Sequence, residues 1–169
     1  KESLETTHFV VMDSKGEAVS MTITLNGNYG SGIVSQKYGI ALNNEMDDFT
    51  TLPGRPNQYG LFQGKANWVQ AEKRPLSSMS PTIVTENDKA VLALGAPGGP
   101  RIISGVFQSL YRILYNKLNI EKAIMTPRLH HQFLPDILFV EKNSFSPLVL
   151  KKLQRRGHKL KYIKNVAKA

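Results

Sequence analysis

Hydrophobic and polar residues alternate in two runs at the start of the chain. Residues 6–13 and 18–25 follow the two-residue period of a strand, and Ser14-Lys15-Gly16-Glu17 between them is typical of a turn. The pattern predicts a β-hairpin. Because side chains on a strand alternate between its faces, Thr22 and Thr24 are expected on one face, opposite Met21 and Ile23.

The middle of the chain predicts a loop, a second hairpin and a helix. A short apolar strand is expected around residues 39–42, while residues 47–75 lose periodicity and collect prolines and glycines. Long loops in compact domains usually carry function. Apolar runs at 81–84 and 90–94 predict the second hairpin, and helical spacing over 102–117 predicts an amphipathic helix packed on a sheet.

The last third predicts alternating strands and helix. Residues 137–141 are strand-like, Ser146 is a helix N-cap followed by Pro147, Gly157 would end that helix, and residues 159–163 could form one more strand. Hairpins followed by helices favour an α+β domain with sheet and helix in contact.

Length and composition allow one domain. The chain has 169 residues, of which 41% are hydrophobic, enough for one core. No apolar run approaches the roughly 20 residues of a membrane helix, so no membrane span is expected. The absence of cysteine excludes disulfides, thiol nucleophiles and thiolate metal sites.

The net charge of +9 is concentrated near one end. Eight of the 22 basic residues lie within residues 150–169, which contain no acidic residue. A basic tail suits a solvated helix surface or an acidic partner as well as a polyanion, and no nucleic-acid motif accompanies it. We therefore expect no nucleic-acid partner. A non-catalytic binding module whose basic tail meets acidic partners remains an alternative.

Thr6 opens the first predicted strand and is a candidate nucleophile. A Thr hydroxyl is activated when the free α-amino group of the same residue acts as its base. Residues 1–5 precede Thr6, so this chemistry requires cleavage between Glu5 and Thr6, by attack of the Thr6 hydroxyl on the Glu5 carbonyl. The alternative is an ordinary strand threonine.

Glycines between a strand and a helix offer backbone donors. In Gly95-Ala96-Pro97-Gly98-Gly99, bare N–H groups can approach a ligand and form an oxyanion hole. The run lacks the Gly-Lys-Ser/Thr ending of a phosphate-binding loop. A simple turn that leads into a helix is the alternative.

Three carboxylates within residues 43–48 suit a cationic ligand. An ammonium is favoured over calcium, because the spacing differs from that of the twelve-residue calcium loop. A solvated acidic turn is the alternative. Residues 73–80 place hydroxyls behind two cations, which suits a carboxylate. His130 and His131 are adjacent and cannot easily bind one ion, so neither a metal nor a cofactor is expected.

Five ordered blocks together strongly resemble the small subunit of γ-glutamyltranspeptidases. These blocks are Thr6-Thr7-His8, Thr24-Leu25-Asn26, residues 43–49, residues 74–81 and Gly95-Ala96-Pro97-Gly98-Gly99. Residues 127–132 and Leu134-Pro135-Asp136 look similar to that family as well. The order and intervals fit across nearly the whole chain.

The resemblance implies an N-terminal-nucleophile hydrolase fold, an αββα sandwich of two antiparallel sheets between helices. It implies a heterodimer cut from one precursor, with Thr6 as the new N-terminus. Thr6 would attack the γ-amide of glutathione or another γ-glutamyl compound and form a γ-glutamyl ester. Water would then complete hydrolysis, and an amino acid or dipeptide acceptor would complete transpeptidation.

The resemblance also assigns roles to residues. Thr24 would orient the Thr6 hydroxyl, and the Gly98 and Gly99 N–H groups would hold the oxyanion. The substrate-binding residues would be Asn26, Glu45 and Asp48 for the α-amino group, Ser77 and Ser78 for the α-carboxylate, and residues 53–64 with Tyr59 as a lid loop.

Further expectations follow for the whole molecule. Residues 1–5 would end the large subunit, and residues 6–169 would form a small-subunit catalytic domain that stops short of the family's last strands. The large subunit would supply an Arg that binds the substrate carboxylate. Without it the uncleaved chain would be inactive, with an apolar face and a sheet edge uncovered. A periplasmic or secreted location is implied. A cephalosporin-acylase-like glutaryl amidase is the alternative enzyme.

Overall fold

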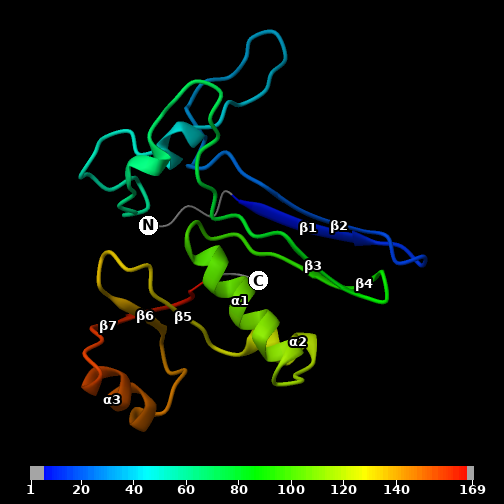
Figure 1. Cartoon of the computed structure of the whole chain (residues 1–169), viewed down its shortest axis with the longest axis vertical. Coiled ribbons are helices and arrows are strands. Elements are labelled where there is room, and N and C mark those ends of the chain that lie inside the picture. Colours follow the sequence, from blue (N-terminus) through cyan, green and yellow to red (C-terminus); the bar gives the residue numbers. More distant parts are fainter. Residues whose placement is uncertain (1–5, 167–169) are drawn as a thin grey trace.

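Two strand hairpins, a long helix and a small C-terminal sheet make up the fold. The computed structural model describes residues 6–166, and Figure 1 shows the hairpins side by side with the helix beneath them. The elements are β1 (Thr7–Met12), β2 (Ala18–Ile23), the 3-10 turns η1 (Glu45–Asp48) and η2 (Lys65–Asn67), β3 (Thr82–Glu86), β4 (Lys89–Leu94), α1 (Arg101–Leu114), α2 (Ile120–Met125), β5 (Leu129–His130), β6 (Leu138–Glu141), α3 (Pro147–Arg155) and β7 (Leu160–Ile163).

The first hairpin is confirmed, and its turn is closed by a side chain. Asp13 Oδ1 accepts hydrogen bonds from the backbone N–H groups of Lys15 and Glu17, both at 2.9 Å. This capping is the usual reason for Asp at the start of a turn. The antiparallel register pairs Thr7 with Ile23.

The second hairpin is also confirmed and packs against the first. β3 and β4 pair antiparallel. Ser20 Oγ donates to the Leu94 carbonyl at 3.2 Å, and the Ala90 N–H donates to the Gly16 carbonyl at 3.1 Å. These contacts hold the polar face of β2 against β4.

Helix α1 provides the main apolar packing. Ile102 and Val106 are fully buried and cluster with Ala96, and Leu94 packs against this cluster. The predicted amphipathic helix is therefore confirmed. Helix α2 was not predicted, and Asn119 caps it by accepting a hydrogen bond from the Lys122 N–H at 2.8 Å.

The C-terminal sheet is mixed. β5 pairs antiparallel with β6, but β6 and β7 run parallel. The parallel pair follows from the connection, because α3 crosses between the strands as in a βαβ unit. Ser146 caps α3 as predicted, accepting from the Val149 N–H. The expectation of antiparallel sheets holds for both hairpins and is wrong for β6 and β7.

The predicted strand around residues 39–42 is absent. Only an isolated bridge between Val34 and Ala41 forms there, and Ile40 is 59% exposed. The segment pairs with residues 31–35, through hydrogen bonds such as that from the Leu42 N–H to the Ile33 carbonyl at 2.9 Å, but this pair joins no larger sheet, and an isolated two-stranded pair is only marginally stable. The predicted loop over residues 47–75 contains only turns and one further bridge, between Thr50 and Trp68.

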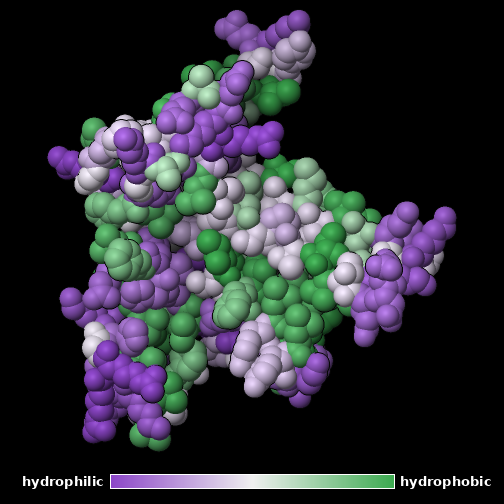
Figure 2. Space-filling model, in the orientation of Figure 1, coloured by the Kyte–Doolittle hydropathy of each residue, from purple (hydrophilic) through white to green (hydrophobic). Residues whose placement is uncertain are grey.

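The hairpin β1–β2 turns its apolar face outward. Val11, Val19 and Ile23 are each at least half exposed, whereas the alternate residues Ser20 and Thr22 lie toward the second hairpin. Apolar residues also gather on the visible face over α1 (Figure 2), where Phe107 is 63% exposed. Exposed apolar faces of this extent mark sites of interaction. None of the helices within residues 6–166 is long and apolar enough to cross a bilayer.

Gly95 is predicted to be intolerant of a side chain. A Cβ there would lie 2.2 Å from His8 Cε1. Overpacking of this kind costs about 2 kcal/mol. We expect Gly95→Ala to lower the melting temperature of the full-length protein. Gly64→Ala is the matched control, because a Cβ at Gly64 meets no atom within 4 Å; equal melting temperatures for both variants would contradict the prediction.

Candidate functional site

Thr6 and Thr24 form a hydroxyl pair where the first hairpin meets the loop region. Thr6 Oγ1 donates to Thr24 Oγ1 at 3.1 Å, and Thr24 Oγ1 also accepts from the Asn26 N–H at 2.9 Å. The register of β1 and β2 brings the two threonines opposite each other. The Thr6 hydroxyl is therefore held in a fixed direction before any ligand binds.

Residues from distant segments converge beside this pair. All the predicted site residues except Gly98 line one small pocket, together with Met79 and Ile102. They are Thr6, Thr24, Asn26, Glu45, Asp48, Tyr59, Ser77, Ser78 and Gly99. The pocket thus combines the Thr6–Thr24 hydroxyl pair with acidic, serine hydroxyl and glycine groups.

The glycine turn leads directly into α1. Gly98 and Gly99 have φ values of 137° and 56°, in the region that favours glycine. Their carbonyls accept from the N–H groups of Arg101 and Ile102 and so begin the helix. Gly99 lines the pocket and Gly98 is its buried neighbour, which suits two adjacent backbone donors beside Thr6.

Two carboxylates of η1, those of Asp48 and Glu45, have raised pKa values. Burial, together with the negative charges of Glu45 and Asp47, raises the pKa of Asp48 to about 7. Burial also raises the pKa of Glu45. Clustered acids with raised pKa values are stabilised by a bound cation. The site can therefore accept an ammonium group with release of a proton.

Tyr59 covers the pocket from the long loop. Its hydroxyl donates to the Asn26 carbonyl, and its ring lies so close to Gly99 that a Cβ there would be 3.0 Å from Tyr59 Cε1. The same loop is tied to η1, because Asp47 Oδ2 accepts from the Gln58 N–H at 3.0 Å. The loop therefore sits over the predicted substrate site.

The neighbouring histidines have separate partners. His130 is 2% exposed, and its Nδ1 and Nε2 lie 2.8 Å from Ser104 Oγ and 2.9 Å from Gln132 Oε1. His131 Nε2 instead lies 3.1 Å from Asp136 Oδ1. Within residues 6–166, no group of three His, Asp or Glu side chains could hold a metal ion.

Sequence reasoning gave no role to two residues that support the site. Asn44 Oδ1 accepts from the Gly27 N–H at 2.7 Å, and its carbonyl accepts from Asn26 Nδ2 at 3.2 Å. His8 Nδ1 lies 2.9 Å from Thr22 Oγ1, and burial lowers the pKa of His8. Both residues stand in the resembling motifs, but only the structure shows what they contact.

The model of one family, described as gamma-glutamyltranspeptidase, matches residues 1–169. The chain belongs to the γ-glutamyltranspeptidase family. It is 53% identical over 159 residues to the glutathione hydrolase proenzyme of Escherichia coli (strain K12), a match that covers 94% of this chain and 27% of the relative. The chain thus spans about a quarter of that relative's length.

Solved structures of the family confirm the fold. A threonine-to-alanine variant of the Helicobacter pylori γ-glutamyltranspeptidase superposes with a TM-score of 0.90 at 46% identity, covering 95% of this chain and 87% of that one. The Pseudomonas nitroreducens enzyme complexed with L-DON gives 0.85 at 41% identity, covering 95% and 85%. The predicted α+β N-terminal-nucleophile hydrolase fold is therefore confirmed.

A cephalosporin acylase has a related fold. The Bacillus halodurans enzyme gives a TM-score of 0.70 at 25% identity and matches 86% of this chain and 25% of that one. The structural similarity extends to an amidase outside the glutathione hydrolases. The fold alone therefore does not distinguish a γ-glutamyltranspeptidase from a cephalosporin acylase, and the residues of the pocket are needed for that distinction.

Asp48 is predicted to destabilise the folded γ-glutamyltranspeptidase chain as pH rises. Its pKa is about 7 when folded and 3.8 in the reference state, so the folded state binds the proton more tightly. Its contribution to the free energy of unfolding is fully present below pH 3.8 and is lost as pH rises through 7. We expect the ligand-free full-length Asp48→Asn variant to lack this loss, measured as melting temperature against pH. Parallel curves for parent and variant would refute it.

Proposed function

We propose that this chain is the catalytic part of a glutathione hydrolase and γ-glutamyltransferase, with Thr6 as the nucleophile. The observation that carries the proposal is the Thr6–Thr24 hydroxyl pair, which opens onto a pocket lined by Glu45, Asp48 and Ser77. Family membership supports the same chemistry. The roles below are part of this proposal.

Cleavage of the precursor creates the catalytic amine. The Thr6 hydroxyl attacks the Glu5 carbonyl, the peptide C–N bond breaks, and an ester forms between Glu5 and the Thr6 oxygen. Water hydrolyses this ester and leaves a Glu5 carboxylate and a free Thr6 α-amino group. An unperturbed α-amino group has a pKa of about 8, which suits a general base near neutral pH.

Turnover repeats the acyl transfer on a substrate. The α-amine takes the hydroxyl proton as Thr6 Oγ1 attacks the γ-carbonyl, and the Gly98 and Gly99 N–H groups hold the oxyanion. One such donor lowers the barrier by about 3 kcal/mol. The leaving amine takes the proton, a γ-glutamyl ester remains, and water or an amino acid or dipeptide acceptor resolves it.

Charge selects the γ-glutamyl group. Its α-ammonium binds Asn26, Glu45 and Asp48, which stabilises the ionised carboxylates and releases the proton that Asp48 carries near neutral pH. Its α-carboxylate accepts hydrogen bonds from Ser77 and Ser78. A glutaryl group lacks the ammonium and would leave the acids unpaired, which is costly in a buried site.

The large subunit of the same precursor is the proposed partner. It would cover the outward apolar residues of β1–β2, such as Val11 and Ile23, and supply an Arg for the substrate carboxylate. The roughly three quarters of the E. coli relative that this chain does not match provide the length for such a subunit. A periplasmic or secreted location rests on the resemblance and stays a prediction.

Thr6 is predicted to be required for both cleavage and turnover. In the full precursor, we expect Thr6→Ala to yield one uncleaved chain without γ-glutamyl activity, read by mass spectrometry of the N-terminus and by release of p-nitroaniline from γ-glutamyl-p-nitroanilide. Thr6→Ser, which keeps a hydroxyl, is the matched control and should retain cleavage. A folded parent with an intact Glu5–Thr6 bond would refute the mechanism.

Substrate preference separates the two candidate enzymes. With γ-glutamyl- and glutaryl-p-nitroanilide compared on one preparation, we expect kcat/KM to favour the γ-glutamyl substrate by roughly a hundredfold, since loss of a hydrogen bond to a charged group costs up to about 3 kcal/mol. Asp48→Asn should reduce that ratio. Equal rates in the parent would instead favour a cephalosporin-acylase-like amidase.

A further inference from the structure

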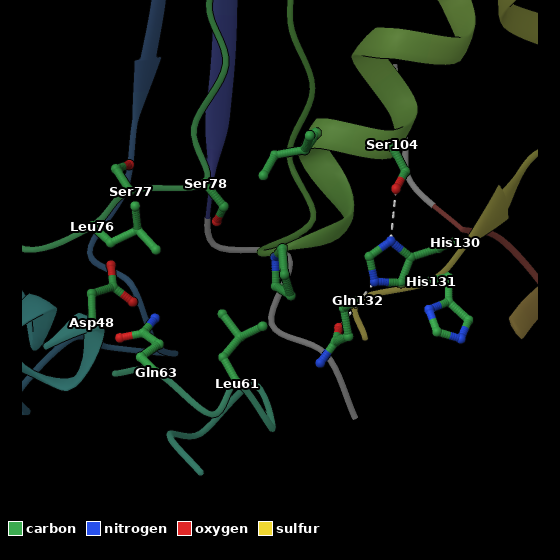
Figure 3. Close-up of a pocket in the computed structure, with 12 residues that line it drawn as sticks. Asp48, Leu61, Gln63, Leu76, Ser77, Ser78, Ser104, His130, His131 and Gln132 are labelled. Atoms are coloured by element: carbon green, nitrogen blue, oxygen red, sulfur yellow. Dashed lines mark hydrogen bonds between the residues drawn. The ribbon is translucent and has the colours of Figure 1, made fainter. Parts of the chain in front are cut away.

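A half-buried network of polar side chains, with His130 fully buried at its centre, connects α1 to the loop that covers the pocket. His130 lies on β5, with Ser104 of α1 on one side of its ring and Gln132 on the other (Figure 3). Gln132 Nε2 then donates to the Tyr59 carbonyl at 3.2 Å, across 73 positions of the sequence, and to the Leu134 carbonyl at 3.2 Å. This series of hydrogen bonds thus ends on the backbone of the loop.

The chemistry of the donors and acceptors fixes which partner donates in each hydrogen bond of this network. The Gln132 carbonyl oxygen can only accept, so His130 Nε2 carries the proton and Nδ1 accepts from the Ser104 hydroxyl in the neutral ring. Burial lowers the pKa of His130 and outweighs the hydrogen bond to Gln132, which raises it, so the neutral ring is favoured. With its oxygen held by His130, Gln132 turns its NH₂ group toward Tyr59.

The hydrogen-bond network ends at Tyr59, the loop residue that lies over the pocket. Tyr59 is tied at its hydroxyl to the Asn26 carbonyl and at its own carbonyl to Gln132. Within the loop, Asn57 Oδ1 accepts from the N–H groups of Tyr59 and Leu61, both at 3.0 Å. The loop is therefore organised internally, and Gln132 joins it to the C-terminal sheet region.

We propose that Gln132, oriented by His130, is a positioning residue that holds the loop of residues 53–64 closed over the Thr6 pocket. The effect on catalysis rests on the proposed function, whereas the effect on the loop does not. Gln132 lines a neighbouring cavity together with Asp48, Ser77 and Ser78, but it is not among the residues that line the Thr6 pocket. It would act through Tyr59, by limiting how often the loop opens.

Two substitutions separate this role from simple packing. Gln132→Ala removes all three hydrogen bonds of the amide, whereas Gln132→Glu keeps the acceptor for His130 and loses the donors to the Tyr59 and Leu134 carbonyls. Gln154→Ala is the matched control, because Gln154 lies exposed on α3. All variants are expressed as the full-length precursor and compared with the parent after cleavage, and circular dichroism confirms that each is folded.

Hydrogen exchange reads the loop directly. Loss of one net hydrogen bond corresponds to roughly a fivefold change in an opening equilibrium, so we expect exchange in peptides spanning residues 57–64 to rise about fivefold in both Gln132 variants and to stay unchanged in Gln154→Ala. Unchanged exchange in Gln132→Ala would overturn the proposal. Parent-level exchange in Gln132→Glu would also overturn it, because the donated hydrogen bond would not matter.

Kinetics read the consequence for the substrate. We expect KM for γ-glutamyl-p-nitroanilide to rise by roughly fivefold in both Gln132 variants with kcat changed less than about twofold, since the loop holds the donor without touching the reacting atoms. A fall in kcat alone would overturn the positioning role. A parent with no Thr6-dependent γ-glutamyl activity would reject the proposed function, and the exchange result would still decide the role of Gln132.

Discussion

The register of the first hairpin is the constraint on which the site depends. Pairing Thr7 with Ile23 places Thr6 across from Thr24 and turns Ser20 and Thr22 toward β4. A slip of one residue would reverse both faces and carry the Thr24 hydroxyl away from Thr6. The Asp13 turn fixes this register locally, and the contacts to β4 fix it a second time.

The polar inner face of this hairpin explains why its outer face is apolar. A strand in a two-layer domain usually buries its hydrophobic side, yet here the inward side carries His8, Thr22 and Thr24. His8 lies within hydrogen-bond distance of Thr22, and Thr24 accepts a hydrogen bond from Thr6. The hydrophobic residues are consequently displaced to the outside, where Val11 and Ile23 lie exposed. The arrangement is stable only when another layer covers that face, which is what a sandwich fold with a second subunit would provide.

Substrate binding and pocket closure meet at η1. Asp48 lines the pocket, while its neighbour Asp47 holds the covering loop through the Gln58 N–H. The same short turn therefore places acidic side chains in the pocket and anchors the loop above it. Gln132, which follows β5, provides a second anchor for the loop.

Local patterns determined the parts of this protein that depend on short-range physics. Alternation and turn residues predicted both hairpins, helical spacing predicted α1, and the Ser146 cap predicted α3, because each is set by neighbours in sequence. The blocks around Thr6, Glu45 and Gly98 predicted the chemistry. The roles of the site residues remain proposals, although the structure brings these residues together.

Long-range packing decided the rest. The segment near residue 40 pairs with residues 31–35 without joining a larger sheet, so the strand expected there does not form, and β6 and β7 are parallel because α3 crosses between them. The raised pKa of Asp48, the inward polar face and the contact between Gln132 and Tyr59 likewise arise between distant segments. Burial and electrostatic environment are properties of the folded arrangement, so no local pattern could reveal them.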